Sequence, residues 1–298
     1  MKKAAGTDSV GFWRNARRQL KGLMRRIAFA IPITKAIWIA YSRSKAIPSF
    51  AGWGMRTEHH TPWDVDAFFG DTTVSDFQKV NSKIVAAATT GKINLSQFKN
   101  ESNLEGLLQE LTWRHYIVFW TARFAVRNVA EKEKNLVECG VCDGLTLHFA
   151  MDAIKADGLE FKAFAYDAWE GMREQDLLDA EKSSTGAYSY LSIDNTKNNL
   201  IDFQNEVTFI KGNIPASFAN ATRPDAIAWL HIDLNSSQPT TAALEFFFNK
   251  IAGGGVVLFD DYGWHGQEET KKAVDIFFKD KPGMLFPLPT GQAIFFKF

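Results

Sequence analysis

Residues 137–144 read Val-Glu-Cys-Gly-Val-Cys-Asp-Gly and join a short apolar run, 135–140, to a helical stretch. Gly140 allows a sharp turn of the chain, and Gly144 allows the backbone to come close to a ligand. Glu138 lies near the carboxyl end of the run, where doubly wound α/β folds bind their ligands. We therefore interpret this stretch as a strand, a glycine turn and a helix that form one wall of a binding site.

Two ligand classes compete for this turn. A dinucleotide fingerprint, G-x-G-x-x-G, needs glycine where this chain has Cys142 and Leu145. The spacing E-x-G-x-x-x-G instead suits S-adenosylmethionine, because a carboxylate in the turn, Glu138 or Asp143, can hold the ammonium of its amino-acid tail. Asp167 ends the next apolar run, about 20 residues further on, and can accept hydrogen bonds from ribose hydroxyls. Both ligand classes use such an acid, so it indicates an adenosine ligand without separating them.

Apolar runs alternate with helical stretches through the rest of the chain, which predicts a parallel sheet covered by helices on both faces. The predicted strands are 135–140, 161–166, 207–211, 226–232, 255–259, 284–288 and 293–298, and the predicted helices are 76–88, 103–130, 145–156, 193–203, 240–251 and 268–278. The last two strands are joined by only 289–292, which is too short for a crossover, so they must form an antiparallel hairpin. The predicted fold class is α/β: a Rossmann-like seven-stranded sheet with an antiparallel last strand, preceded by an N-terminal helical extension.

The chain has 298 residues and a formal net charge of zero, but the charge is unevenly spread. Residues 1–45 carry eleven basic side chains and one acidic side chain, a net charge of +10, so residues 46–298 carry −10. Apolar and basic positions recur at helical spacing over residues 12–31, which predicts a basic amphipathic helix. Such a helix either contacts an anionic membrane surface or an acidic partner, or packs on the body or on a second subunit. We also expect a homo-oligomer.

We divide the chain into a basic arm with its connector, 1–70, N-terminal helices, 71–130, and a Rossmann-like core, 131–298. No stretch approaches the ~20 apolar residues of a membrane span, so we expect a cytoplasmic protein, at the inner membrane surface if the arm binds lipid. The chain has only two cysteines, Cys139 and Cys142, which are too few for a disulfide scaffold. We assign both to the glycine turn rather than to a redox pair, because no thioredoxin-like order of elements follows. The acidic body offers no basic groove for nucleic acid.

Three aspartates follow two of the predicted strands. Asp233 follows 226–232, and Asp260 and Asp261 follow 255–259. Neighbouring parallel strands lie ~4.8 Å apart, so these carboxylates converge at the carboxyl edge of the sheet. They repel one another unless a cation joins them, and oxygen ligands of this kind suit Mg²⁺. The alternative is that they cap the helices that follow, which Asp261 could do.

At these residues the sequence resembles the class I S-adenosylmethionine-dependent methyltransferases, and most closely the macrocin O-methyltransferase type, which methylates sugar hydroxyls. The resemblance covers residues 104–298, so the body, 71–298, is the expected methyltransferase domain. It rests on Val137-Glu138-Cys139-Gly140 with Gly144, on Asp167-Ala168-Trp169-Glu170-Gly171, on Lys211-Gly212-Asn213, on His231-Ile232-Asp233, and on Gly253-Gly254-Gly255 leading to Asp260-Asp261-Tyr262-Gly263-Trp264. Two departures bear on the acceptor: Asp233-Leu234-Asn235-Ser236-Ser237 stands where the family has Asp-Leu-Tyr-Glu-Ser, and Trp169 replaces a common Phe.

The resemblance implies a role for each group of residues. We assign binding of the cofactor to Glu138, Gly140, Gly144, Thr146, Asp167, Trp169 and Asn213, and binding of a divalent cation to Asp233, Asp260 and Asp261. The predicted reaction is in-line transfer of the sulfonium methyl to a hydroxyl of a sugar or glycoconjugate, which the metal acidifies. Asp233 and His265 are the candidate bases, and 171–190 is a candidate lid. The alternatives are a nicotinamide-dependent oxidoreductase and an inactive membrane-surface binding module.

Overall fold

The computed structural model describes residues 72–130, 132 and 134–298, with only the backbone described for residues 72–75. The predicted arm and connector, 1–70, lie outside the described residues, and so do the amphipathic helix at 12–31 and its expected contacts with a membrane or a second subunit. None of the described helices is both long enough and apolar enough to cross a membrane.

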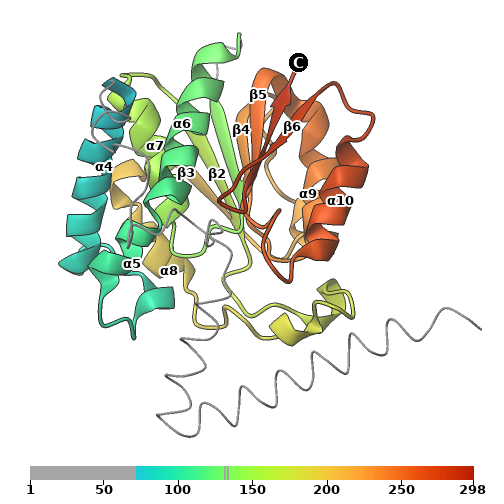
Figure 1. The fold of residues 1–298 in the computed structure, drawn as a ribbon, viewed down its shortest axis with the longest axis horizontal. Helices are drawn as coiled ribbons and strands as arrows, with labels where there is room; N and C mark the ends of the chain where they lie inside the picture. Colours follow the sequence, from blue (N-terminus) through green and yellow to red (C-terminus); the bar gives the residue numbers. More distant parts are fainter. Residues whose placement is uncertain (1–71, 131, 133) are drawn as a thin grey trace, which may run out of the picture. The chain divides into compact units, whose positions relative to one another are not determined.

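A seven-stranded sheet forms the core of the described chain (Figure 1). Its strands are β1 (Asn135–Cys139), β2 (Lys162–Asp167), β3 (Val207–Lys211), β4 (Ile227–Ile232), β5 (Ile251–Phe259), β6 (Gly283–Pro287) and β7 (Ala293–Lys297). Their order is β3-β2-β1-β4-β5-β7-β6, and β7 is antiparallel to both of its neighbours while the other pairs are parallel. The predicted fold class is therefore confirmed, with the antiparallel hairpin at the end of the chain.

The α-helices lie close to their predicted positions. They are α4 (Thr72–Thr89), α5 (Leu104–Glu110), α6 (Thr112–Asn128), α7 (Leu145–Ala156), α8 (Ile193–Asn199), α9 (Ser237–Phe247) and α10 (Glu268–Phe278). The predicted helix 103–130 is two helices, because Leu111 adopts a ψ of −1° and separates α5 from α6. Strand β5 begins at Ile251, inside the predicted helix 240–251, because α9 ends at Phe247.

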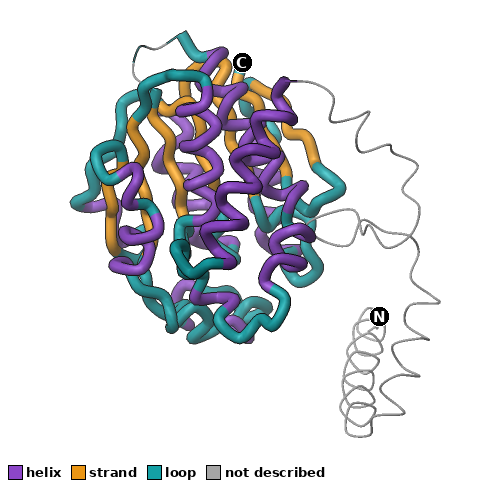
Figure 2. Tube along the Cα trace, turned by 90° about the vertical axis from the view of Figure 1, so that its left-hand side faces the viewer, coloured by secondary structure: helices purple, strands orange, loops and turns teal. Residues whose placement is uncertain are grey.

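Side-chain alternation along the strands divides the core into two layers, as the two-residue period of a strand requires. Leu136, Trp229 and Leu258 belong to the layer that contains α4, α6 and α7. Val137 and Leu230 belong to the layer that contains α9 and α10, so the sheet lies between two sets of helices (Figure 1). Figure 2 looks onto one of these sets, with the strands behind it. Every second residue at the carboxyl ends of β1, β4 and β5 therefore points toward α6.

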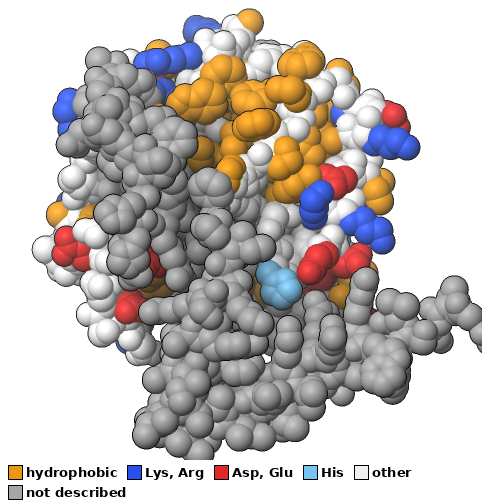
Figure 3. All heavy atoms as spheres, viewed as in Figure 1, with side chains coloured by type: hydrophobic (Ala, Val, Ile, Leu, Met, Phe, Trp, Pro, Cys, Tyr) orange, Lys and Arg blue, Asp and Glu red, His pale blue; other side chains and the backbone are white. Residues whose placement is uncertain are grey.

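Strand β6 forms one edge of the sheet and carries apolar side chains on its surface. Met284 and Phe286 are each about half exposed. On the face presented in Figure 3, hydrophobic side chains gather over this end of the sheet. An exposed edge strand can pair with another chain, and the homo-oligomer stays a prediction.

Candidate active site

A pocket opens at the carboxyl ends of β1, β2, β3 and β4. It is lined by Gln97, Arg114, Gly140, Val141, Cys142, Asp143, Leu145, Thr146, Asp167, Ala168, Glu170, Met172, Arg173, Asp176, Leu177, Tyr188, Leu191, Gly212, Asn213, Ile214, Asp233, Leu234, Asn235, Ser236 and Pro239. Gly140 and Gly144 adopt φ angles of +86° and +84°, which favour glycine. A Cβ on Gly140 would also overlap the carbonyl oxygen of Asp233, because β1 and β4 are neighbours. Gly144 shapes the turn but lies outside the pocket lining.

Asp167 holds the glycine turn in place. Its Oδ2 accepts hydrogen bonds from the backbone N–H groups of Val141, at 2.7 Å, and Cys142, at 2.9 Å. Its Oδ1 accepts a third from the N–H of Trp169 at 2.6 Å. Burial raises the pKa of Asp167, although these donors oppose the shift. Because Asp167 also lines the pocket, it both braces the turn and faces the ligand site.

The other predicted cofactor residues divide between the pocket and the interior. Thr146 and Asn213 line the pocket, and Nδ2 of Asn213 donates to Glu170 beside it. Trp169 is only 4% exposed, and its Nε1 donates to Oγ1 of Thr196 at 2.8 Å. Trp169 therefore packs beneath the turn and does not reach the pocket lining.

Asp143 lines the pocket, but its carboxylate already has protein partners. Oγ of Ser96 donates to both of its oxygens, at 2.7 and 2.8 Å, and Nδ2 of Asn195 donates to Oδ1 at 2.7 Å. The connection between α4 and α5 is thus tied to the glycine turn. The turn's cysteines, Cys139 and Cys142, are free thiols whose pKa values burial raises, which suits packing residues better than a redox pair.

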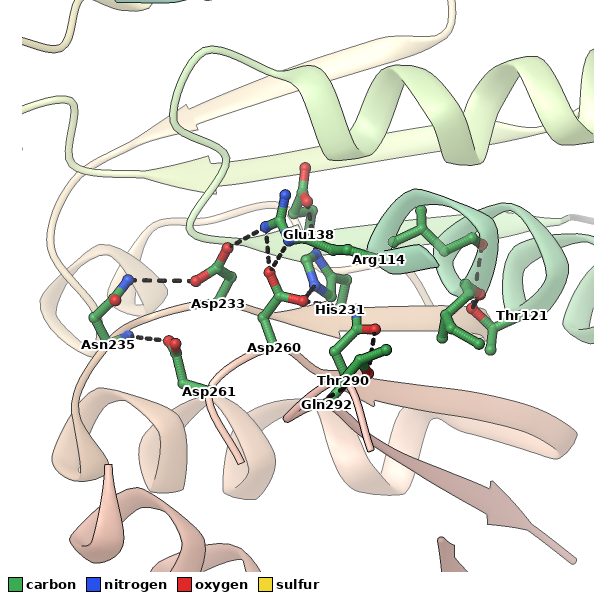
Figure 4. A network of polar contacts seen from close by, with 12 residues as sticks. Arg114, Thr121, Glu138, His231, Asp233, Asn235, Asp260, Asp261, Thr290 and Gln292 are labelled. Atoms are coloured by element: carbon green, nitrogen blue, oxygen red, sulfur yellow. Dashed lines mark hydrogen bonds and ion pairs between the residues drawn. The ribbon is translucent and has the colours of Figure 1, made fainter. Parts of the chain in front are cut away.

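A series of charged side chains runs behind the pocket from β1 to α6 (Figure 4). Oε1 of Glu138 lies 2.7 Å from Nδ1 of His231, and Nε2 of His231 lies 3.7 Å from Oδ1 of Asp260. Arg114 donates from Nε to Oδ2 of Asp260 at 2.7 Å, and from Nη2 both to Asp260 and, at 2.9 Å, to Oδ2 of Asp233. We call Glu138, His231, Asp260, Arg114 and Asp233 the buried charge chain. Glu138 belongs to it and does not line the pocket.

Strand alternation explains why these side chains meet. Glu138, His231 and Asp260 each follow by two positions a strand residue that packs in the α6 layer, so they point toward the same helix. Arg114 approaches from the other side, one turn before the core residue Val118 and on the same face of α6. The buried charge chain therefore forms only when β1, β4, β5 and α6 are assembled.

Within the buried charge chain, each charged group shifts the pKa values of its neighbours. Burial favours a neutral His231, but its two carboxylate neighbours outweigh burial and raise its pKa to about 9. Burial also disfavours the charge on Asp260, yet Arg114 and His231 lower the pKa of Asp260 well below its usual value. Burial and the neighbouring Asp260 and Asp261 raise the pKa of Asp233 well above its usual value. Asp233 is therefore suited to accept a proton.

Asp261 lies beside Asp233 and outside the buried charge chain. Its Oδ2 accepts a hydrogen bond from the backbone N–H of Asn235 at 3.0 Å, and Nδ2 of Asn235 donates to Oδ1 of Asp233 at 3.3 Å. Burial and the charge of Asp260 raise the pKa of Asp261 to about 6. Of the three predicted metal ligands, Asp233, Asp260 and Asp261, only Asp233 lines the pocket.

At the predicted Mg²⁺ site, Asp233 and Asp260 already pair with a cation of the protein itself. His231, Asp233 and Asp260 present ligand atoms within 4.8 Å of one another, but Nη2 of Arg114 contacts both aspartates. A metal ion there would displace Arg114, and leaving a buried charge without its partner costs about 3–5 kcal/mol. The described residues therefore do not fit a Mg²⁺ site, and we assign no chemical step to a metal.

The structure does not bring His265 to the pocket. Its side chain is 88% exposed, and its Nδ1 lies 3.8 Å from Oε1 of Glu268 at the start of α10. The loop after Asp261 carries it to the surface, so we do not retain it as a base of this site.

The predicted lid, 171–190, is an ordered segment that contributes to the pocket. Met172 and Ala187 pair through a backbone hydrogen bond of 2.9 Å. Glu181 anchors the segment, since its Oε1 accepts a hydrogen bond from the N–H of Ser237 at the start of α9, at 2.8 Å. The segment adds Met172, Arg173, Asp176, Leu177 and Tyr188 to the pocket lining. Its motion stays a prediction.

Comparison with known families decides between the ligand classes left open by the sequence. Residues 137–262 match a family model described as a methyltransferase domain. The chain contains a methyltransferase domain. Together with the seven-stranded fold, this match confirms the prediction of a class I S-adenosylmethionine-dependent methyltransferase and leaves the nicotinamide alternative without support.

Solved structures share the fold of this methyltransferase. The O-methyltransferase NovP is similar over 76% of this chain and 99% of its own, with 17% sequence identity and a TM-score of 0.58. Calicheamicin methyltransferase CalS11 is similar over 80% of this chain and 99% of its own, with 15% identity and a TM-score of 0.51. No curated protein sequence matches the chain.

Two partners of Asp260 in this methyltransferase were not predicted from the sequence. The sequence could have indicated a buried role for Arg114, because it is a charged residue on the same α6 face as the core residue Val118. No sequence pattern indicates the role of Gln292. It lies in the hairpin between β6 and β7, where its Nε2 donates to Oδ1 of Asp260 at 2.8 Å. His231 was noted only as part of a motif, without a role.

Proposed function

We propose that this methyltransferase transfers the methyl group of S-adenosylmethionine to a hydroxyl of a sugar or glycoconjugate, with Asp233 as the general base. The observation that carries the proposal is the position of Asp233 in the pocket lining beside the glycine turn. We do not include Mg²⁺ in this proposal, because Arg114 already contacts both Asp233 and Asp260.

The charge of the pocket suits a cationic methyl donor. Its lining includes five carboxylates and two guanidinium groups, from Asp143, Asp167, Glu170, Asp176, Asp233, Arg114 and Arg173. This excess of negative charge favours a sulfonium and an ammonium group and disfavours the pyrophosphate of a dinucleotide. Asp167 ends β2, Glu170 follows it and Asn213 follows β3, and these three residues would hold the adenosine end. When bound, S-adenosylmethionine supplies a methyl group on a positively charged sulfur.

Asp233 is held in a fixed orientation for proton transfer. Its Oδ2 accepts a hydrogen bond from Arg114, and its Oδ1 accepts one from Asn235. Asp233 takes up the proton that the acceptor hydroxyl loses as its oxygen is methylated, and it releases this proton to water afterwards. General-base catalysis of this kind contributes about 10²–10⁴-fold to the rate.

The polar side chains of the predicted lid, 171–190, favour an acceptor that carries hydroxyl groups. Arg173, Asp176 and Tyr188 line the pocket from this side, and the hydroxyl of Tyr188 donates to Oδ1 of Asn235 at 3.2 Å. Polar groups at these positions can hydrogen-bond a sugar and close the site to water. The choice of a sugar also rests on the resemblance to the macrocin type and on the fold shared with NovP, an O-methyltransferase.

Titration calorimetry with S-adenosylhomocysteine and a screen of glycan acceptors with a labelled methyl donor test the proposal. Asp233→Asn should lower the rate of methyl transfer at least 100-fold and change the affinity for S-adenosylhomocysteine less than threefold. Asp202→Asn, on the exposed surface, is the matched control and should behave as the wild type. Undiminished turnover in Asp233→Asn would rule out this base, and transfer to nitrogen or carbon acceptors alone would rule out the substrate class.

A further inference from the structure

The guanidinium of Arg114 lies at the centre of the carboxylate cluster. Its Nε and Nη2 both donate to Oδ2 of Asp260, and Nη2 also donates to Oδ2 of Asp233 (Figure 4). Asp260 is completely buried, and its other oxygen accepts the hydrogen bond from Gln292. Both oxygens of Asp260 therefore accept hydrogen bonds from protein donors, and Arg114 supplies the positive charge beside Asp260 and Asp233.

We propose that Arg114 takes the place of a divalent cation in this site, so that it neutralises Asp260, orients Asp233 and makes methyl transfer independent of metal. The catalytic part of this inference rests on the proposed function, whereas the identity of the resident cation does not. Arg114 acts through Asp233 and is a positioning residue.

A guanidinium is well suited to this task. It is planar, it keeps its charge at any physiological pH, and its donors diverge at fixed angles, so it can hold carboxylates from β4 and β5 at the same time. Helix α6 fixes its position, because Val118 is buried in the core and Oγ1 of Thr121 accepts a hydrogen bond from Nε1 of Trp229 at 3.0 Å. A lysine at position 114 would keep the charge but lose the forked geometry.

Removing the guanidinium should create the metal site that it now fills. Without Arg114, Asp233 and Asp260 offer oxygen ligands within 4.8 Å of each other. Two carboxylates of this kind suit Mn²⁺ or Mg²⁺. The substitution Arg114→Ala therefore has an effect that a purely structural arginine would not have, namely a gain of metal binding.

Titration with Mn²⁺, followed by electron paramagnetic resonance, measures this binding with neither methyl donor nor acceptor present. The wild type should show no site with a Kd below about 1 mM. Arg114→Ala should bind one Mn²⁺ per chain at least tenfold more tightly. Arg123→Ala is the matched control, because Arg123 is also a buried α6 arginine that pairs with two aspartates, Asp157 and Asp76, in another part of the protein, and it should gain no site.

Methylation assays then test the consequence for catalysis. The wild type should keep at least half of its rate in a chelator, while Arg114→Ala should lose about 100-fold and recover in part with Mg²⁺ or with added guanidinium. Arg114→Lys, which keeps the charge, should bind no Mn²⁺ and lose about tenfold in kcat, with the KM for the methyl donor unchanged.

Three results would overturn the inference: stoichiometric Mn²⁺ binding by the wild type, a tenfold loss of its rate on chelation that Mg²⁺ restores, or a folded Arg114→Ala variant that gains no metal site. If Arg114→Ala does not fold, the wild-type titration and Arg114→Lys decide the question. A wild type that binds no Mn²⁺ and methylates no hydroxylated acceptor supports Arg114 as the resident cation and refutes the proposed function.

Discussion

Replacing Glu138 by glutamine tests two roles against each other. The motif predicts a contact with the cofactor, whereas the structure shows a buried contact with His231. Glu138 is completely buried, 2.7 Å from Nδ1 of His231. The pKa of His231 is about 9 in the folded chain and about 6.5 when unfolded, a difference worth up to about 3 kcal/mol. Since the folded value is the higher one, this stability is fully present below pH 6.5 and is lost as the pH rises through about 9.

The substitution Glu138→Gln keeps the shape of the side chain and removes one of the two carboxylates that hold the charge on His231. Breaking a buried ion pair costs about 3–5 kcal/mol, and the amide oxygen can still accept one hydrogen bond, so we expect the lower end of this range. At about 2–4 °C per kcal/mol for a chain of this size, Tm should fall by about 6–12 °C at pH 7. The loss of unfolding free energy between pH 7 and 10 should also be smaller than in the wild type.

Unfolding followed from pH 6 to 10, together with calorimetric titration of S-adenosylhomocysteine, measures both quantities. The Kd should change less than threefold, because Glu138 does not line the pocket. Glu160→Gln, on the exposed surface, is the control and should change the unfolding free energy by less than about 0.5 kcal/mol. A tenfold rise in Kd with an unchanged Tm would refute the buried role and restore the cofactor contact.

Three further predictions concern the pocket. Asp167→Asn should weaken binding of S-adenosylhomocysteine by about 10- to 100-fold in calorimetry, because the hydrogen bonds that its carboxylate accepts from the N–H groups of the glycine turn are worth about 1.5–3 kcal/mol each; an unchanged Kd would contradict this. Gly140→Ala should abolish soluble expression or lower Tm by more than 10 °C, since its Cβ would overlap the backbone of Asp233; a wild-type melting curve would contradict it. Burial and the neighbouring carboxylates raise the pKa of Asp233 well above its usual value. Because only the ionised base accepts a proton, kcat/KM should fall on the acid side at a pH well above the ~3.9 of an ordinary aspartate; a profile that stays flat down to about pH 4 would contradict this.

The strands and the final hairpin were predictable because local patterns determine them. The short connection 289–292 allows only an antiparallel return. The buried face of α6 was harder to predict, since the large residues Trp120 and Phe124 are only half-buried while Ala122 and Ala125 are fully buried. Val118 and Phe119 are fully buried on the same face, so a pattern that follows Trp120 and Phe124 misses it.

The site was predictable where a motif follows a strand end and unpredictable where distant segments meet. Asp167 and Asp233 line the pocket as expected. Glu138 has the residue type and the position that the motif requires, but strand alternation turns it toward α6, away from the pocket. The contact between Arg114 and Asp260 joins residues 146 positions apart, and no local pattern records such a pair.

That separation along the chain has a consequence for synthesis. Translation delivers α6 first, and at about 5–20 residues per second the ribosome adds Asp260 about 7–30 s after Arg114. During this interval a nascent chain cannot bury the arginine, because its acidic partners have not yet been made. The final packing of the protein is therefore a late event that the last third of the polypeptide triggers.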